Sequence, residues 1–458
     1  MKVYLKSFGI IACCVFSILT ISCGGDNTKD EPTPTITPVT PDPDKAMTPT
    51  QQKEKLENVA IEFMNQLPSS DFDDISTLGN YIRNNYGEDY DWESVGDWAR
   101  DLWDDTKQAT GITDRESRWG YTIAYTNFNS LLMASNFTGH FTAKNGTWRR
   151  TDANDLQFIF DDQNGTTCVL KLVTSGHITK VHAGSIDEYQ YYQGSTEYYD
   201  RTNCTIGVPE NIVVTLTQGS KEVVKTTVKI DLESLSGEEF DISKNNLSLT
   251  TLVELNNGYK FNLSQVSYKA NQKASTSFVM TKNGKEMVTL AASSTLSGIP
   301  ACNASAFAND FDIDDYNTDN ANAFNPYVKI DILGKVQIQG KVNDVRNFVE
   351  DLQDADDNYS NETKYKQFIN NANSLMDVNV FYDGKAAKQA NIRLEPFIDW
   401  SWNGKDYWTV EPVIVFFDGS SYSTFEAFFN DTNFKKTIDN FKHLANRYAS
   451  LVDETINW

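Results

Sequence analysis

Two-residue turns of the Asn-Gly type recur through this chain and constrain its fold more than any other feature. They include Asn145-Gly146, Asn283-Gly284 and Asn403-Gly404. Asn-Gly suits a type I′ turn, in which both central residues take a positive φ, and this turn joins two antiparallel strands. The flanking runs alternate apolar and polar residues, as in Val223 to Ile230. The sequence therefore predicts an antiparallel sheet built of hairpins.

Apolar residues at a helical period flank and interrupt these strands. Thr48-Pro49 is typical of a helix start, and one apolar face then runs from Leu56 to Leu67 before Pro68. Further helices are expected over 72–86, 92–103, 342–352, 365–376 and 434–451, and strands over 327–339, 391–400 and 407–417. Blocks of strands and helices that do not alternate regularly indicate an α+β fold. We expect a large curved antiparallel sheet with N-terminal, central and C-terminal helices packed on it.

The chain begins with the pattern of a secretory signal. Lys2 and Lys6 precede an apolar run from Phe8 to Ile21, which is shorter than the roughly 20 residues of a membrane span. Leu19 to Cys23, the sequence Leu-Thr-Ile-Ser-Cys, resembles a bacterial lipobox, whose Cys becomes the lipidated first residue of the mature protein. That resemblance implies a lipid on Cys23 as the only attachment to the membrane.

A second resemblance concerns the side of the membrane. Lys29-Asp30-Glu31 resembles the Lys-plus-acidic signal that sends Bacteroidota lipoproteins to the outer face of the outer membrane. A segment rich in Pro, Thr and Asp follows up to Met47, and it cannot bury enough apolar surface to fold. In an extended polyproline conformation this linker spans up to about 70 Å. We therefore expect a folded body held outside the cell by its lipid.

The predicted organisation has six segments: a signal peptide at 1–22, a lipid-anchored linker at 23–47, a helical segment at 48–116, an antiparallel β region at 117–300, an acidic loop at 301–326, and a mixed α/β region at 327–458 that packs on the same body.

The net charge of −23 argues against nucleic-acid binding, because no basic stripe is available to neutralise phosphates. Beyond the leader and Cys23 only three cysteines remain, Cys168, Cys204 and Cys302, so at most one disulfide forms.

Two aromatic groups are candidates for ligand binding. The first is Tyr189, Tyr191, Tyr192, Tyr198 and Tyr199, which form either a sugar-binding surface or a cross-strand ladder that stabilises a ribbon. The second surrounds the turn Asn403-Gly404 and comprises Trp400, Trp402, Tyr407 and Trp408. If the turn has two residues, Trp400 and Trp402 share a face and Tyr407 lies opposite Trp400. This second group is either a binding platform or a plug at the edge of the core.

An acidic stretch offers one possible metal site. Asp310, Asp312 and Asp314 alternate along the predicted loop, and carboxylates in such a pattern can surround Ca²⁺. The stretch lacks the Gly and Glu of an EF-hand, so a solvated acidic loop is the alternative.

Catalytic motifs are absent from the sequence: it contains no nucleophile elbow, no phosphate-binding loop and no zinc helix. We therefore expect a non-catalytic module that binds a glycan, a peptide or an envelope protein. The alternatives are a hydrolase of polysaccharides and a carrier with a lipid-binding cavity.

The anchor can be tested directly. Replacing Cys23 by Ser removes the thioether that carries the lipid, so the Cys23→Ser protein is expected in soluble fractions after cell fractionation. A Cys23→Ser protein that stayed with the membrane would contradict the lipid anchor.

Overall fold

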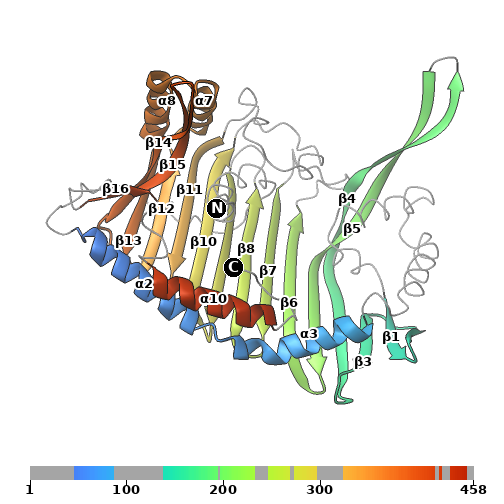
Figure 1. The fold of residues 1–458 in the computed structure, drawn as a ribbon. Coiled ribbons are helices and arrows are strands. Elements are labelled where there is room, and N and C mark those ends of the chain that lie inside the picture. Colours follow the sequence, from blue (N-terminus) through green and yellow to red (C-terminus); the bar gives the residue numbers. More distant parts are fainter. Residues whose placement is uncertain are drawn as a thin grey trace. The chain divides into compact units, whose positions relative to one another are not determined.

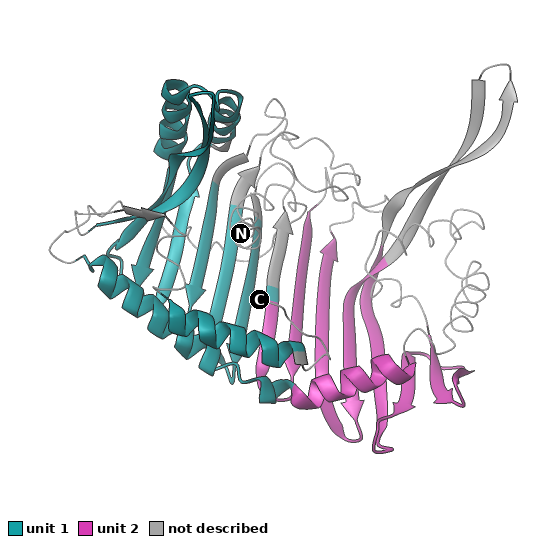
Figure 2. Ribbon diagram, in the orientation of Figure 1, with its two compact units in different colours: residues 1–72, 263–458 teal, residues 73–262 magenta. Residues whose placement is uncertain are grey.

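The computed structural model describes residues 46–86, 138–193, 196–232, 246–268, 273–296, 323–417, 422–424 and 434–450. Side chains within 180–207 and a few other stretches of these ranges are not described. The chain divides into two compact units, residues 1–72 with 263–458 (unit 1) and residues 73–262 (unit 2) (Figure 2). Strand β8 (Tyr259–Tyr268) begins in unit 2 and ends in unit 1.

Unit 2 contains seven further strands and one helix among its described residues. The strands are β1 (Gly139–Lys144), β2 (Thr147–Thr151), β3 (Leu156–Asp161), β4 (Thr167–Gln193), β5 (Thr196–Gln218), β6 (Lys221–Leu232) and β7 (Leu247–Leu255). They follow the order β7-β6-β5-β4-β3-β1-β2 (Figure 1). Neighbouring strands are antiparallel except β1 and β3, which pair in parallel.

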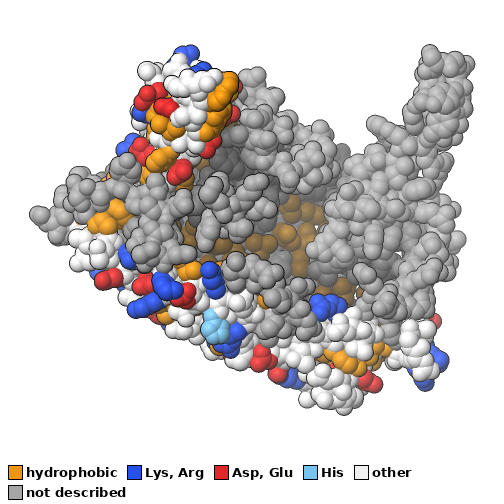
Figure 3. Space-filling model, viewed as in Figure 1, with side chains coloured by type: hydrophobic (Ala, Val, Ile, Leu, Met, Phe, Trp, Pro, Cys, Tyr) orange, Lys and Arg blue, Asp and Glu red, His pale blue; other side chains and the backbone are white. Residues whose placement is uncertain are grey.

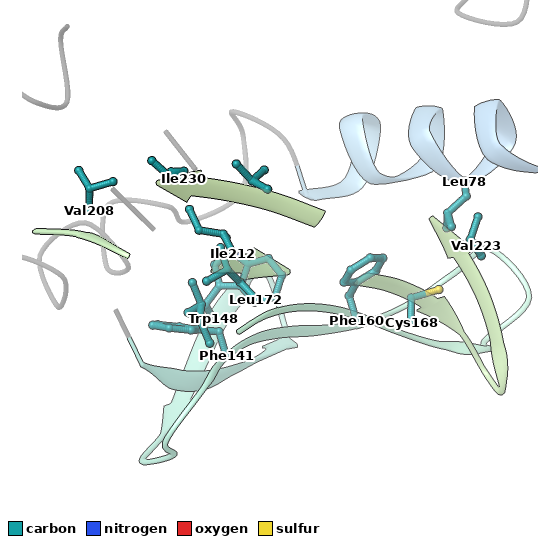
Figure 4. Close-up of a cluster of buried hydrophobic side chains, with 12 residues drawn as sticks. Leu78, Phe141, Trp148, Phe160, Cys168, Leu172, Val208, Ile212, Val223 and Ile230 are labelled. Carbon is teal, nitrogen blue, oxygen red and sulfur yellow. The ribbon is translucent and has the colours of Figure 1, made fainter. Parts of the chain in front are cut away.

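The core of unit 2 lies between its sheet and helix α3 (Asp73–Tyr86). Leu78 of α3 packs in one cluster with strand residues that include Phe160, Cys168 and Val223 (Figure 4). Cys168 is fully buried with a free thiol, and burial raises the pKa of that thiol. The Cys204 side chain and Cys302 lie outside the described residues.

Unit 1 contains the remaining strands. They are β9 (Lys273–Lys282), β10 (Lys285–Leu296), β11 (Ala323–Ile332), β12 (Val336–Val342), β13 (Met376–Tyr382), β14 (Ala390–Trp402), β15 (Lys405–Phe416) and β16 (Tyr422–Thr424). From β8 to β16 they are hydrogen-bonded in the order of the sequence. The helices are α2 (Pro49–Asn65), α7 (Val345–Asp357), α8 (Glu362–Leu375) and α10 (Lys435–Ser450), and a 3₁₀ turn, η2, covers Ser69–Phe72.

Helix α2 crosses the strands at the ends where their hairpins turn (Figure 1). Lys55 pairs with Asp383 of the β13–β14 turn at 2.5 Å, and Glu62 pairs with Lys335 of the β11–β12 turn. Seven residues of helix span about 10.5 Å, close to the roughly 9.6 Å between alternate strands of a sheet. The helix therefore places one charged side chain at each of these two hairpin turns.

A buried glutamine fixes the start of α2. Gln52 is 1% exposed, and its amide donates to the carbonyl oxygens of Gln389 at 2.8 Å and Met47 at 3.0 Å. Its Oε1 accepts from the Tyr382 hydroxyl at 3.2 Å. The side chain thus satisfies polar groups of the segment before α2, of β13 and of the β13–β14 connection at once.

The α+β class and the hairpin-built antiparallel sheet are confirmed. The predicted helix start at Thr48 is confirmed by its capping box with Gln51. The Asn-Gly turns are confirmed as well, since Asn145, Asn283 and Asn403 each have a positive φ, as does the glycine that follows. The helix expected over 342–352 begins only at Val345, because Val342 still pairs with Met376 as the last residue of β12. The residues 92–103 lie outside the described residues.

The prediction of one strand over 327–339 was wrong. The chain turns at Leu333-Gly334, with φ values of 56° and 66°, and forms the hairpin of β11 and β12. A leucine rarely takes a positive φ, so Leu333 hid the turn, and Gly334 was its only local signal. The sequence contains no local signal that would have predicted the parallel pairing of β1 with β3.

The hydrogen bonds of the buried Gln52 side chain predict a large loss of stability when that side chain is truncated. Gln52→Ala leaves the Tyr382 hydroxyl and buried carbonyls without their partner, and we expect the free energy of unfolding to fall by about 3 kcal/mol. Urea denaturation followed by circular dichroism measures this change. Glu54→Ala, on the exposed side of the same helix, is the control, with an expected change within about 0.5 kcal/mol. Equal effects of the two substitutions would contradict the role of Gln52.

Candidate functional site

The β14–β15 hairpin continues beyond the strand that pairs with it. β13 pairs with β14 only at residues 390–392, whereas β14 pairs with β15 up to Trp402 and Lys405. At Leu394 the side chain of Asn373 on α8 replaces the missing strand: it donates to the carbonyl at 2.6 Å and accepts from the amide at 2.8 Å. Residues 395–411 therefore form a two-stranded ribbon.

A β-bulge at Asp399 decides which face of this ribbon each side chain takes. Ile398 lies opposite Trp408, but Trp400 lies opposite Tyr407, so Asp399 is one extra residue on β14. Because side chains alternate along a strand, the extra residue moves Trp400 and Trp402 to the face opposite that of Ile398 and Trp408.

The face that carries Trp408 packs on α8. Trp408 lies against the buried cluster of Ala355, Tyr365 and Ile369, together with Leu394 and Val410. The Lys366 ammonium lies 4.5 Å from the centre of the Trp408 ring. The amide of Trp408 donates to the carbonyl of Tyr359, in the α7–α8 connection, at 2.7 Å. Trp408 is therefore part of the core that supports the hairpin.

The other face presents aromatic rings to solvent. Trp400 and Tyr407 stack with centroids 3.8 Å apart and planes 3° from parallel, and the Tyr359 ring lies 5.4 Å from Tyr407. Trp400 is 48% exposed and Trp402, beside the turn, is 62% exposed. We call Tyr359, Trp400, Trp402 and Tyr407 the aromatic surface. Hydrophobic side chains are visible on the end of unit 1 formed by α7, α8 and this hairpin (Figure 3).

The aromatic surface is held rigidly. Asn403-Gly404 forms the predicted two-residue turn, and on the far face the Ser401 hydroxyl donates to the Asp406 carboxylate at 2.5 Å. The Tyr407 ring contacts both Trp400 and Tyr359. Stacked rings with restricted rotamers lose little entropy when a ligand binds, which favours binding.

Sequence reasoning found most of this site. The pairing of Trp400 with Tyr407, and the shared face of Trp400 and Trp402, are confirmed by the register. The plug interpretation fits Trp408, which packs in the core. The platform interpretation fits Trp400 and Trp402, which are exposed. Tyr359 was missed: it lies 48 residues before Tyr407, and only the packing of α7 and α8 brings the two together.

The structure does not describe the side chains of the other candidate residues. The tyrosine group lies at the end of the β4–β5 hairpin, where the backbone pairs Tyr189 with Tyr199 and Tyr191 with Tyr198, and the side chains are not described. Cys23, Asp310, Asp312 and Asp314 lie outside the described residues. Within the described residues no group of three or more His, Cys, Asp or Glu side chains is placed to hold a metal ion.

One charged cluster in unit 2 has a structural role. Both oxygens of Asp155 are used: Oδ1 lies 2.6 Å from His140 Nε2, and Oδ2 accepts from Lys171 at 2.8 Å and Gln157 at 3.0 Å. Hydrogen bonds from Lys171, Gln157 and His140 hold the pKa of Asp155 well below its usual range. The cluster joins β1, β3 and β4 where the parallel pair begins.

The chain matches no known protein family, no curated protein and no solved structure. None of the helices in the described ranges is both long enough and apolar enough to cross a membrane. The aromatic surface is therefore the basis on which a function is proposed.

The Asp155 cluster predicts a pH-dependent effect. The folded pKa of Asp155 is depressed, so its stabilisation is present above the unfolded pKa of about 3.9 and is lost as the pH falls toward the folded value. Asp155→Asn is expected to lower the free energy of unfolding by about 2 kcal/mol at pH 7.

The difference between wild type and Asp155→Asn should narrow below about pH 4, as measured by urea denaturation at several pH values. Asp152→Asn, which removes the partner of an exposed ion pair with Arg150, is the control with little effect. A pH-independent difference for Asp155→Asn would contradict the ionic origin of the effect.

Proposed function

We propose that this chain is a surface-exposed lipoprotein whose body is a non-catalytic binding module, and that the aromatic surface binds uncharged saccharide. The observation that carries the proposal is the exposure of Trp400 and Trp402 on a face that the bulge at Asp399 directs away from α8. The core does not need these two rings on that face.

The chemistry of the surface suits sugar rings. The face of an aromatic ring is electron-rich, and the C–H groups on one face of a sugar ring are slightly positive, so the two surfaces attract and exclude water. Trp400 and Trp402 stand two residues apart along β14, about 7 Å. Exposed Asn403 and Lys405 beside the rings supply donors for sugar hydroxyls.

A stable protein partner fits less well. An aromatic side chain buries about 150–250 Å² when fully covered, so two half-exposed tryptophans offer on the order of 250 Å². Each partner in a standard protein interface buries about 800 Å². The only exposed aliphatic side chain of the ribbon, Ile398, lies on the other face.

A membrane partner is disfavoured by charge. Exposed Asp399 and Asp406 lie at the end of the hairpin, and the whole chain carries a net charge of −23. Moving carboxylates toward an anionic or apolar phase is costly. A saccharide in water imposes no such cost.

The proposed lipid on Cys23 and the linker would place this surface outside the cell. A tether of up to about 70 Å would hold the folded body away from the bilayer, where extracellular polysaccharide is available. The two proposals are independent, since the aromatic surface does not require the lipid.

The binding test compares wild type with Trp400→Ala and Trp402→Ala. Native gels that contain laminarin, xylan, galactomannan or glycogen measure retardation of the protein. We expect at least one polysaccharide to retard wild type, and each substitution to weaken binding about tenfold, or roughly 1.4 kcal/mol, through loss of a stacked ring.

Ile398→Ala is the matched control, because it shortens an exposed side chain on the opposite face of the same hairpin and should leave retardation unchanged. A parallel arm measures flotation of the unlipidated Cys23→Ser protein with phosphatidylcholine vesicles. Tryptophan-dependent binding to vesicles instead of polysaccharide would overturn the ligand class. Retardation that both substitutions left intact would overturn the surface itself.

A further inference from the structure

The exposed face of the ribbon does not end at the aromatic surface. The register of β15 is regular through the ribbon, so Thr409 and Glu411 lie on the same face as Tyr407. Their partners on β14, Phe397 and Glu395, lie on that face as well. One continuous strip therefore runs from the turn to the sheet. It consists of four cross-strand pairs: Trp402–Lys405, Trp400–Tyr407, Phe397–Thr409 and Glu395–Glu411.

The strip is long and open enough for a chain of several sugars. The residue steps from Lys405 to Glu411 span about 20 Å along β15. Beyond the two exposed tryptophans, the side chains of Phe397, Thr409 and both glutamates are partly exposed. An oligosaccharide laid along the strands would contact the tryptophans near the turn and the glutamates near the sheet.

Stabilisation of the ribbon does not account for the pair of Glu395 and Glu411. Carboxylates directly opposite each other on antiparallel strands repel and destabilise the pairing. In the part of the chain that the structure describes, neither carboxylate forms a hydrogen bond or an ion pair with another residue. Arg393, one cross-strand pair further along this face, is exposed and does not pair with either of them. Repulsion between the two glutamates is therefore not offset by the residues around them.

Sugar hydroxyls are suitable partners for these two carboxylates. An ionised carboxylate only accepts hydrogen bonds, and each glutamate offers two oxygens. Adjacent hydroxyl groups of one sugar ring can donate to both oxygens of one carboxylate, and hydrogen bonds to a charged acceptor are stronger than those between neutral groups. Rings that stack on sugars and carboxylates that accept from their hydroxyls thus lie in line on one face.

We propose that Glu395 and Glu411 form the polar end of the saccharide site and determine its specificity. The ligand is then a segment of several sugars, bound along the strands, with free adjacent hydroxyls on the sugar that reaches the glutamates. The proposal rests on the proposed function of the aromatic surface. A sugar chain with blocked hydroxyls could still stack on Trp400 and Trp402 but could not donate to the glutamates.

The test compares a disaccharide with a hexasaccharide by isothermal titration. The probes are laminari-, xylo-, manno- or malto-oligosaccharides, according to which polysaccharide retards wild type. The hexasaccharide spans the strip, whereas a disaccharide on the tryptophans does not reach the glutamates. We expect Glu395→Ala and Glu411→Ala each to weaken binding of the hexasaccharide about tenfold and to leave the disaccharide unchanged. Trp400→Ala should weaken both.

Three controls separate recognition from folding and from net charge. Glu411→Gln removes the repulsion but keeps one acceptor oxygen, so it should raise the urea midpoint and weaken the hexasaccharide less than Glu411→Ala; a purely structural role predicts a lower midpoint. Glu54→Gln removes the same charge from the exposed side of α2 and should leave both affinities unchanged. A hexasaccharide with acetylated hydroxyls should bind wild type and Glu411→Ala with the same Kd.

The outcomes separate this inference from the proposed function. If the glutamate variants bind the hexasaccharide as wild type does while Trp400→Ala is weakened, the polar end is wrong and the aromatic surface stands. Glutamate substitutions that weaken both probes equally would overturn the arrangement along the strip. If Trp400→Ala binds both probes as wild type does, the aromatic surface fails, and this inference fails with it.

Discussion

The positive φ of the two-residue turns is the constraint on which the rest of this structure depends. Asn283-Gly284, Asp383-Gly384 and Asn403-Gly404 each place two consecutive residues in the left-handed region. That geometry allows no freedom in the pairing of the flanking strands, because the turn sets the register from its first pair. Register then decides which side chains meet the helices and which meet water.

A single bulged residue can reverse, over a few positions, which face of the sheet the side chains of a strand occupy. If Asp399 were paired with Tyr407 instead of bulged, Trp400 and Trp402 would share the face of Trp408 and lie toward α8, where Tyr365 and Ile369 already fill the space. With it, the same two tryptophans become exposed on a ribbon whose other face remains packed. The aromatic surface therefore depends both on the turn, which starts the register, and on the bulge, which shifts it.

Helices that cover the turns complete the arrangement. The spacing of Lys55 and Glu62 along α2 matches the spacing of successive hairpins, so the helix and the sheet hold each other in register. At the other end of the hairpins, Asn373 and Tyr359 use backbone-directed hydrogen bonds to secure the edges of β14 and β15. An unprotected edge would invite pairing with another chain, which these contacts prevent.

The sequence by itself determined the class of fold, most turns, the helix start at Thr48 and the face shared by Trp400 and Trp402. These follow from local rules: the φ that Asn-Gly tolerates, the capping of Thr48, and the alternation of side chains along a strand. It did not reveal the hairpin at Leu333, because the residue in the left-handed region is a leucine.

Only the tertiary structure decided the rest. The parallel pairing of β1 with β3, the Asp155 cluster, and the approach of Tyr359 to Tyr407 all join residues whose contact has no local signature. The bulge at Asp399 belongs to the same group, since an extra residue in a strand is visible only against its partner. Exposure of the two tryptophans was decided in the same way, because a side chain is buried or free according to what packs on its face, and a sequence does not state which face a distant helix will cover.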